Sequence, residues 1–193
     1  MGNREDLLAG ARRVIIEHGV ANVTARDIAW EAGVSLAAIG YHFGSKEQLV
    51  TEALLDTLGT GIGDGMGSAI REAKDLALLD GFAALWNRIP AVFAENRETL
   101  LASMENAVRM MRDPVALTRM QDAIEEGYRG VAEDLAETHP DLSPEQALAL
   151  AKLDFVLSQG LGVLWLLSPD GRIPDGDTLA AAVAVLHDEP GPG

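Results

Sequence analysis

The stretch TARDIAWEAGVSLAAIGYHFGSK, residues 24–46, decides how the N-terminal part of this chain folds. Thr24 is followed three residues later by Asp27, which is the pattern of a capping box at the start of a helix. Gly33 predicts the end of that helix, because glycine adopts the left-handed backbone conformation of a helix C-terminus without steric cost. We therefore expect a first short helix over residues 25–32.

A second short helix follows almost at once. Ser35 is a predicted N-cap, and Gly44 predicts the C-terminal end, which gives a helix over residues 36–43. Ser45 and Gln48 then form the pattern of another capping box, so a third helix begins there.

Three residues fix the angle between the two short helices. Ala29 permits a close crossing, Gly33 makes the turn, and Ile39 fills the space between the helices. A small residue, a glycine and a branched hydrophobic residue at about these offsets are typical of a helix-turn-helix, the motif that places its second helix in the major groove of DNA. A helical corner within an ordinary core is the alternative that the spacing leaves open.

The segment after the corner, IGYHFGSKEQL, resembles the end of the DNA-binding domain in the tetracycline-repressor (TetR) family of bacterial transcription regulators. The usual form in that family is close to LYYHFGSKEEL, and the match covers Leu7 to about Leu54. The family often has a tyrosine that touches a phosphate where this chain has Gly40, so any contact from position 40 differs here.

On this interpretation the second helix lies in the major groove. Its candidate contact positions carry no Arg, Lys, Asn or Gln, the side chains that read bases with two hydrogen bonds. We therefore expect apolar contacts with thymine methyl groups from Ala37 or Ala38, phosphate contacts from Tyr41, His42 and Lys46, and discrimination partly through DNA shape. The predicted DNA-binding residues are Thr24, Ala25, Arg26, Ser35, Leu36, Ala37, Ala38, Gly40, Tyr41, His42 and Lys46.

The formal net charge of −15 argues at first against a nucleic-acid partner, but its distribution changes that conclusion. Residues 1–50 hold five Lys or Arg against six Asp or Glu, whereas the rest of the chain holds ten against 24. Nearly all of the excess negative charge thus lies outside the helix-turn-helix. An acidic C-terminal part, residues 51–193, does not prevent DNA binding if it is held away from the DNA, and it discourages non-specific binding to DNA.

Several classes of protein are disfavoured by what the chain contains. There is no cysteine, which fits a reducing cytoplasm, and residues 1–8 lack the apolar core of a signal peptide. The apolar run 155–167 is shorter than the roughly 20 residues that span a bilayer. The four histidines show no metal-ligand spacing and no catalytic motif occurs, so we expect no enzyme, cofactor or metal.

The composition, rich in Ala and Leu, predicts an all-α fold of about nine helices. The predicted domains are a DNA-binding domain over 1–50, an effector-binding and dimerisation domain over 51–188, and a disordered tail over 189–193. The glycine-rich stretch 59–67 is expected to be a frayed helix end, a loop or a hinge, and Pro90 to kink or split its helix. The helices expected outside the motif are 4–18, 46–58, 81–96, 97–112, 114–138, 143–167 and 177–187.

The body also offers candidate ligand and interface residues. Methionines, aromatic residues and isolated polar groups suggest an effector pocket, although each residue taken singly is better explained as core. The candidates are Trp86, Phe93, Met104, Met111, Met120, Tyr128, Phe155, Gln159 and Trp165. The family resemblance implies a pocket in this region and a homodimer formed by the last two helices. The predicted dimer-interface residues are Leu153, Val156, Leu164, Leu179, Val183 and Leu186.

These observations favour a cytoplasmic, dimeric repressor that binds a palindromic double-stranded DNA operator and is released by a small, hydrophobic effector. A family member that activates transcription, or that acts without a small ligand, is the second interpretation. A helical small-molecule carrier or enzyme is the third.

Overall fold

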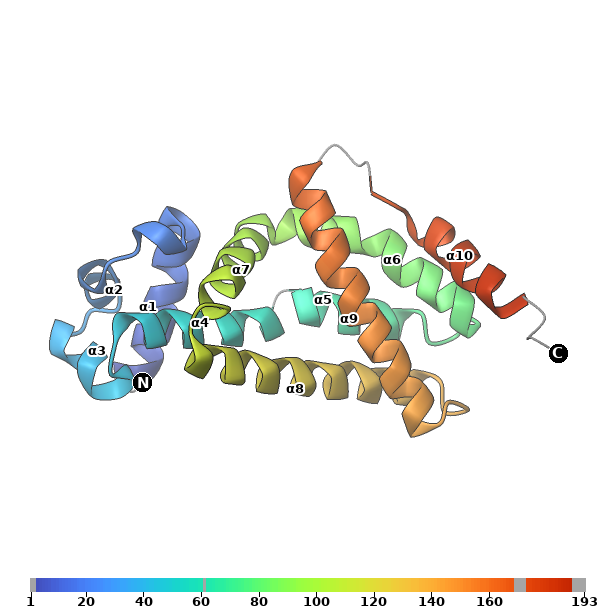
Figure 1. Cartoon of the computed structure of the whole chain (residues 1–193), viewed down its shortest axis with the longest axis horizontal. Coiled ribbons are helices and arrows are strands. Elements are labelled where there is room, and N and C mark those ends of the chain that lie inside the picture. Colours follow the sequence, from blue (N-terminus) through green and yellow to red (C-terminus); the bar gives the residue numbers. More distant parts are fainter. Residues whose placement is uncertain (1–2, 61, 169–172, 189–193) are drawn as a thin grey trace. The chain divides into compact units, whose positions relative to one another are not determined.

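The computed structural model describes residues 3–60, 62–168 and 173–188, with the backbone alone for 55–60 and 187–188. These residues form ten α-helices, one 3₁₀ turn and no strand, so the predicted all-α fold is confirmed (Figure 1). The helices are α1 Asn3–His18, α2 Ala25–Glu31, α3 Leu36–Phe43, α4 Lys46–Thr60, α5 Ile62–Glu72, α6 Leu78–Glu95, α7 Arg97–Met110, α8 Pro114–Thr138, α9 Pro144–Leu167 and α10 Gly176–Asp188; the 3₁₀ turn is Val20–Asn22. The tail predicted over 189–193 lies outside the described residues.

The chain forms two compact units. The first comprises residues 1–61 and 96–124, and therefore contains α1 to α4, α7 and the first part of α8. The second comprises residues 62–95 and 125–193, and contains α5, α6, the rest of α8, α9 and α10. The division predicted at residue 50 falls inside α4, and the functional roles assigned to 1–50 and 51–188 remain predictions.

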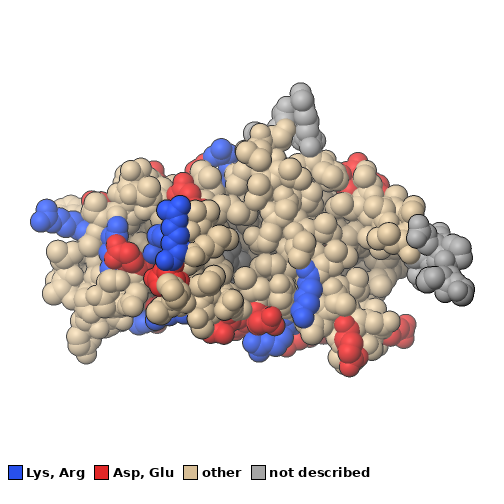
Figure 2. Space-filling view, in the orientation of Figure 1, with Lys and Arg blue, Asp and Glu red and all other residues tan. Residues whose placement is uncertain are grey.

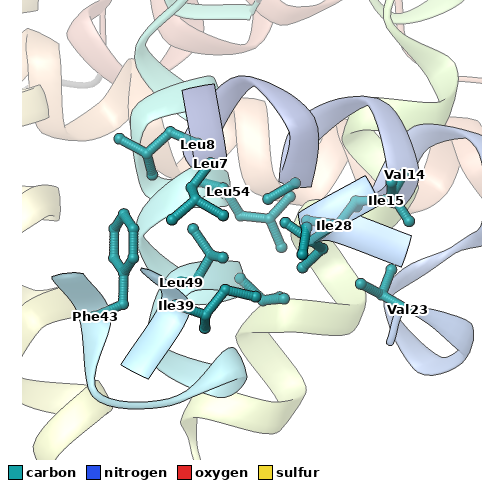
Figure 3. Close-up of a cluster of buried hydrophobic side chains, with 14 of the residues drawn as sticks. Leu7, Leu8, Val14, Ile15, Val23, Ile28, Ile39, Phe43, Leu49 and Leu54 are labelled. Carbon is teal, nitrogen blue, oxygen red and sulfur yellow. The ribbon is translucent and has the colours of Figure 1, made fainter. Parts of the chain in front are cut away.

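The first unit is built around one hydrophobic core (Figure 3). Leu7 and Ile15 of α1, Ile28 of α2, Ile39 of α3 and Leu49 of α4 are all almost completely buried in it. Each helix therefore contributes the apolar stripe that its sequence predicts. The core holds α2 and α3 in place from behind and leaves their opposite surfaces exposed.

The glycine-rich stretch is helical wherever it is described, so of the three expected alternatives (a frayed helix end, a loop or a hinge) the loop is wrong. Helix α5 makes the count ten rather than about nine. In α5, a Cβ atom added to Gly65 would lie 2.7 Å from Val92 Cγ1 of α6. One added to Gly67 would lie 2.7 Å from Asp134 Oδ2 of α8. The glycines thus permit close packing between helices of the second unit, which offsets their low intrinsic helix propensity.

Helix α6 continues through Pro90 without a break, so the predicted split is wrong. Ile89, Val92 and Phe93, on both sides of the proline, are buried. Packing of these side chains holds the helix together although the proline removes one backbone hydrogen bond.

Candidate DNA-binding site and ligand cavity

The helix-turn-helix begins with a complete capping box. Thr24 Oγ1 accepts a hydrogen bond from the backbone N–H of Asp27 at 3.2 Å, and Asp27 Oδ2 accepts one from the N–H of Thr24 at 3.3 Å. Gly33, at φ 66°, then reverses the chain, and the N–H of Val34 donates to the carbonyl of Ala29 at 3.0 Å. The predicted corner is therefore present. Hydrogen bonds fix the start of α2 and the turn between α2 and α3.

Helix α3 differs at one end from the expectation. Gly44, at φ 76°, ends the helix as predicted, and its N–H donates to the carbonyl of Gly40 at 3.1 Å. Ser35 occupies the N-cap position as predicted, but its side chain makes no capping hydrogen bond. The N-terminal N–H groups of α3 are consequently not occupied by the Ser35 hydroxyl and remain able to face a phosphate oxygen.

The exposed surface of α3 carries most of the predicted contact residues. Tyr41 is 85% exposed and Leu36 is 49% exposed, and Ala37 and Gly40 also face solvent. Ala38 instead packs in the core of the unit. Of the two alanines proposed to touch thymine methyl groups, only Ala37 is accessible.

The remaining predicted residues frame this surface. Thr24 and Arg26, at the start of α2, are exposed, whereas Ala25 and His42 are half-buried. The His42 ring meets the Tyr41 ring edge to face, with 4.9 Å between centroids. Exposed polar groups at the N-terminus of α2 thus belong to the same compact unit as the α3 surface.

Lys46 has a structural role that the sequence did not indicate. Its Nζ donates a hydrogen bond to the carbonyl of Val23 at 2.9 Å and lies 3.6 Å from Glu47 Oε1. The side chain therefore ties the start of α4 to the residue that precedes α2. A phosphate contact by Lys46 remains a prediction. In such a contact the ammonium group would already be oriented by its hydrogen bond to the carbonyl of Val23.

Two features of the first unit were not singled out from the sequence. Trp30, at the end of α2, is 87% exposed. Arg109 of α7 hydrogen-bonds through Nη2 to the hydroxyl of Thr51 in α4 and to Asn106 Oδ1 at 2.6 Å. Asn106 and Thr51 are buried, so this network links α7 to α4 through polar groups within the core. Polar residues at inward helical positions are the signal that predicts such a network.

Charge is mixed rather than uniformly positive around the helix-turn-helix. On the face drawn in Figure 2, Lys and Arg side chains alternate with Asp and Glu over the N-terminal elements. Part of the acidic charge is paired: Arg13 Nε lies 2.5 Å from Glu31 Oε1, and Arg4 pairs with Glu52. Such pairing reduces the repulsion that these carboxylates exert on a phosphate backbone.

The nine predicted effector residues are divided between the two units, and their role remains a prediction. Met104, Met111 and Met120 belong to the first unit and the other six to the second. Within the second unit, Phe93 packs on Trp165 with centroids 6.1 Å apart, and Tyr128 meets Phe155 edge to face at 5.1 Å. Gln159 is exposed. None of the nine lines the cavity described next.

The second unit contains a cavity of about 110 Å³. Its walls come from α5, α6, α8, α9 and α10 and from the segments after α5 and α8, and nearly all of them are apolar. The lining residues are Ile70, Ala73, Leu78, Leu79, Gly81, Phe82, Leu85, Leu135, His139, Leu150, Leu153, Asp154 and Val183.

Asp154 is the unusual member of this wall. Its side chain is buried, and Oδ1 accepts a hydrogen bond from the Trp86 indole N–H at 3.2 Å. Burial disfavours the charged carboxylate and raises the pKa of Asp154 to about 7, while the bond from Trp86 acts in the opposite direction. A buried, titratable carboxyl at a cavity wall is a marker of a functional site.

The predicted dimer residues lie on an apolar surface of α9 and α10. Leu153, Val156, Leu164 and Leu186 are exposed, whereas Leu179 and Val183 are half-buried. Three further exposed apolar side chains belong to the same two helices: Val163, Leu167 and Val185. The face drawn in Figure 2 is largely uncharged over α9.

Two features of the described residues bear on metal binding and on membranes. No group of three or more His, Asp or Glu side chains in this part of the chain is placed to hold a metal ion. Helix α9 has 24 residues and by length and composition alone is able to cross a membrane, which differs from the shorter run expected from the sequence. The core helix of a soluble protein passes the same test, so this is weak evidence.

Comparisons with known proteins agree with the helix-turn-helix. Residues 7–53 match the family described as bacterial regulatory proteins, tetR family. The HTH-type transcriptional regulator BetI of Agrobacterium fabrum is 44% identical over 68 residues, which are 35% of this chain and 33% of that protein. The matched segment thus spans about a third of this curated relative.

Solved structures extend the likeness to nearly the whole fold. SCO7518 from Streptomyces coelicolor A3(2) has a TM-score of 0.64 and 26% identity, covering 97% of this chain and 99% of that one. The multidrug binding protein EbrR, complexed with proflavin, has a TM-score of 0.67 and 20% identity, covering 96% and 99%. Residues 7–53, which hold the observed helix-turn-helix, thus match the N-terminal domain of the tetR family of bacterial regulatory proteins, and the likeness to solved structures extends over nearly the whole all-helical fold.

Proposed function

We propose that the protein is a cytoplasmic, dimeric transcriptional repressor that binds a palindromic DNA operator and is released from it by a small effector. The observation that carries the proposal is the exposed surface of α3, with Tyr41 and Leu36, held by Gly33 and Gly44 within a tight helix-turn-helix. The second helix of a helix-turn-helix is the element that enters the major groove of DNA, so side chains exposed on α3 lie where this motif makes its contacts.

The chemistry of α3 defines how it reads DNA. Ala37 meets a thymine methyl group, and Tyr41 and the N-terminus of α3 contact phosphates. Thr24 and Arg26 hold the backbone on the other side of the groove. Helix α3 carries no Arg, Lys, Asn or Gln, the side chains that read a base with two hydrogen bonds. Sequence discrimination therefore comes in part from DNA shape and flexibility.

The dimer is supported by the exposed apolar side chains of α9 and α10. Val156 and Leu164 face solvent in the single chain, and burial of such a patch against a second copy stabilises association. Two-fold symmetry in a four-helix interface then presents two α3 helices to successive major grooves, about 34–36 Å apart.

Effector control is the third part of the proposal. The second unit holds the cavity, and α8 runs without interruption from the first unit into the second. A ligand that favours one arrangement of α4 and α8 changes the affinity of the protein for DNA by a certain factor. DNA then changes the affinity of the protein for that ligand by the same factor. A reporter assay with and without candidate effectors separates this function from the alternative, a regulator that activates or acts without a ligand.

The test of DNA binding uses one informative variant and one matched control. A duplex selected from random sequence is labelled, and binding is followed by fluorescence anisotropy. Tyr41→Ala is expected to weaken binding about tenfold or more, because it removes a phosphate contact. Trp30→Ala removes an equally exposed aromatic side chain from the other end of the motif and is expected to change little. Equal effects of the two changes contradict the proposed surface.

A further inference from the structure

The cavity of the second unit combines an apolar wall with a single acidic group. Leu85 of α6, Leu135 of α8 and Leu150 of α9 face the same space as Asp154. No Lys or Arg lines it, and His139 is the only other lining residue with a titratable side chain. The cavity is therefore suited to a molecule with a carbon framework and one positively charged or hydrogen-bonding group.

Asp154 is held in a position to meet such a group. Among the described residues, only the Trp86 indole donates a hydrogen bond to its carboxyl group, and that bond goes to Oδ1. A carboxyl group has two oxygens and room for several donors. One bond orients Asp154 and leaves Oδ2 free to accept from a ligand in the cavity.

A buried carboxylate without a cationic partner is unfavourable, and a cation supplied from outside removes that cost. An ammonium group fits the geometry, because it donates up to three hydrogen bonds and its carbon substituents contact the leucines. A neutral ligand of the same shape fills the cavity but leaves the carboxylate unpaired.

We propose that this cavity binds a small protonated amine, whose ammonium group pairs with Asp154 while its carbon atoms pack against Leu85, Leu135 and Leu150. This inference rests on the proposed function, since it names the chemical class of the effector. It places the effector among residues other than the nine aromatic, methionine and glutamine residues predicted from the sequence.

The volume limits the size of the ligand. A cavity of ~150 Å³ holds benzene, so about 110 Å³ accommodates roughly four or five non-hydrogen atoms. Leu78 and His139 also line a second hollow of about 450 Å³, which is more polar.

The amine pyrrolidine is the probe of choice, because it has five non-hydrogen atoms and is fully protonated between about pH 6 and pH 8. Tetrahydrofuran is its neutral counterpart of the same shape. Each is titrated into the full-length protein at constant ionic strength. The ¹H–¹⁵N cross-peak of the Trp86 indole, assigned with Trp86→Phe, reports directly on the group that touches Asp154.

The expected result is saturable binding of pyrrolidine at least tenfold tighter than that of tetrahydrofuran. Asp154→Asn keeps an oxygen acceptor for Trp86 but removes the charge, and should weaken pyrrolidine binding at least tenfold. Asp122→Asn removes an exposed carboxylate of α8 and should leave the affinity unchanged. Equal binding of the two probes, or equal binding by wild type and Asp154→Asn, overturns the proposal.

A pH series gives an independent readout. Because Asp154 must lose its proton to pair with the ammonium, pyrrolidine affinity should rise about tenfold from pH 6 to pH 8. His139 is the other titratable side chain at the cavity wall, so His139→Gln is measured beside the wild type and should retain most of the rise. A flat profile in both proteins contradicts pairing with Asp154.

Operator binding separates this inference from the proposed function. If the protein retains a specific duplex but no amine perturbs the Trp86 signal, the inference fails and the proposed function stands. If pyrrolidine binds at Asp154 but no specific duplex is retained, the amine site stands and the proposed regulator fails.

Discussion

Replacement of Asp154 by Asn tests the energetics of the cavity wall through the stability of the protein. The carboxyl group has its ordinary pKa of 3.8 in the unfolded chain and a pKa of about 7 in the folded protein. Between these values the unfolded chain releases a proton that the folded protein keeps, so stability falls as pH rises and the loss is complete above about pH 7.

The size of the effect follows from the difference between the two pKa values. Each unit is worth about 1.36 kcal/mol, and the part of the shift that acts between about pH 5.5 and pH 8 amounts to roughly 2 kcal/mol. An amide does not titrate, and its oxygen still accepts from Trp86. The Asp154→Asn variant should therefore gain about 2 kcal/mol relative to wild type over this range.

The assay is urea-induced unfolding of both proteins at the two pH values, with protein concentration held constant because a dimer's stability depends on it. The quantity of interest is the difference in unfolding free energy between variant and wild type at each pH. A difference that is the same at both pH values refutes the buried, ionising carboxyl. So does a difference that becomes smaller as pH rises.

Three further predictions concern DNA contact, assembly and the α4–α7 link. Lys46→Ala should lower the slope of log affinity against log salt by about 1 per subunit, whereas Lys74→Ala in the body should not; equal slopes for all three proteins remove Lys46 from the interface. Leu164→Glu should give a monomer in light scattering with little operator affinity, and a well-folded dimer of this variant counts against the α9–α10 interface. Arg109→Leu should cost about 1–3 kcal/mol in urea unfolding, because Asn106 loses its buried partner; unchanged stability contradicts the network.

The helix-turn-helix was predictable because its signals are local. Thr24 and Asp27 cap α2 by contacts three residues apart, and Gly33 and Gly44 take the positive φ values that end their helices. Ser35 shows the limit of such reasoning, since a residue type favoured at a cap need not make the bond.

The glycine-rich stretch was mispredicted because its conformation is set by distant residues. Gly65 and Gly67 look like helix breakers in sequence, yet a Cβ atom at either position would lie 2.7 Å from a neighbouring side chain, Val92 or Asp134, so that side chain would have to shift. Tertiary packing overrides helix propensity there, as it does around Pro90.

The ligand cavity was not predictable from residue types alone. Trp86 was selected as a candidate, but it acts as a donor to Asp154 rather than as part of the wall. The signal for this site in the sequence was an acidic residue in a helix that is otherwise apolar. After its first turn α9 carries few charged residues, and Asp154 is the acidic one. Only the folded structure shows that it is buried while its neighbour Lys152 is exposed.

Specific DNA binding tests the central claim most directly. The protein is incubated with random duplexes, the retained sequences are recovered, and the affinity for the enriched duplex is compared with that for a scrambled one at the same salt concentration. The proposed regulator predicts an inverted repeat, two chains per duplex, and an affinity ratio on the order of 10³ or more. Equal affinity for the enriched and scrambled duplexes contradicts it.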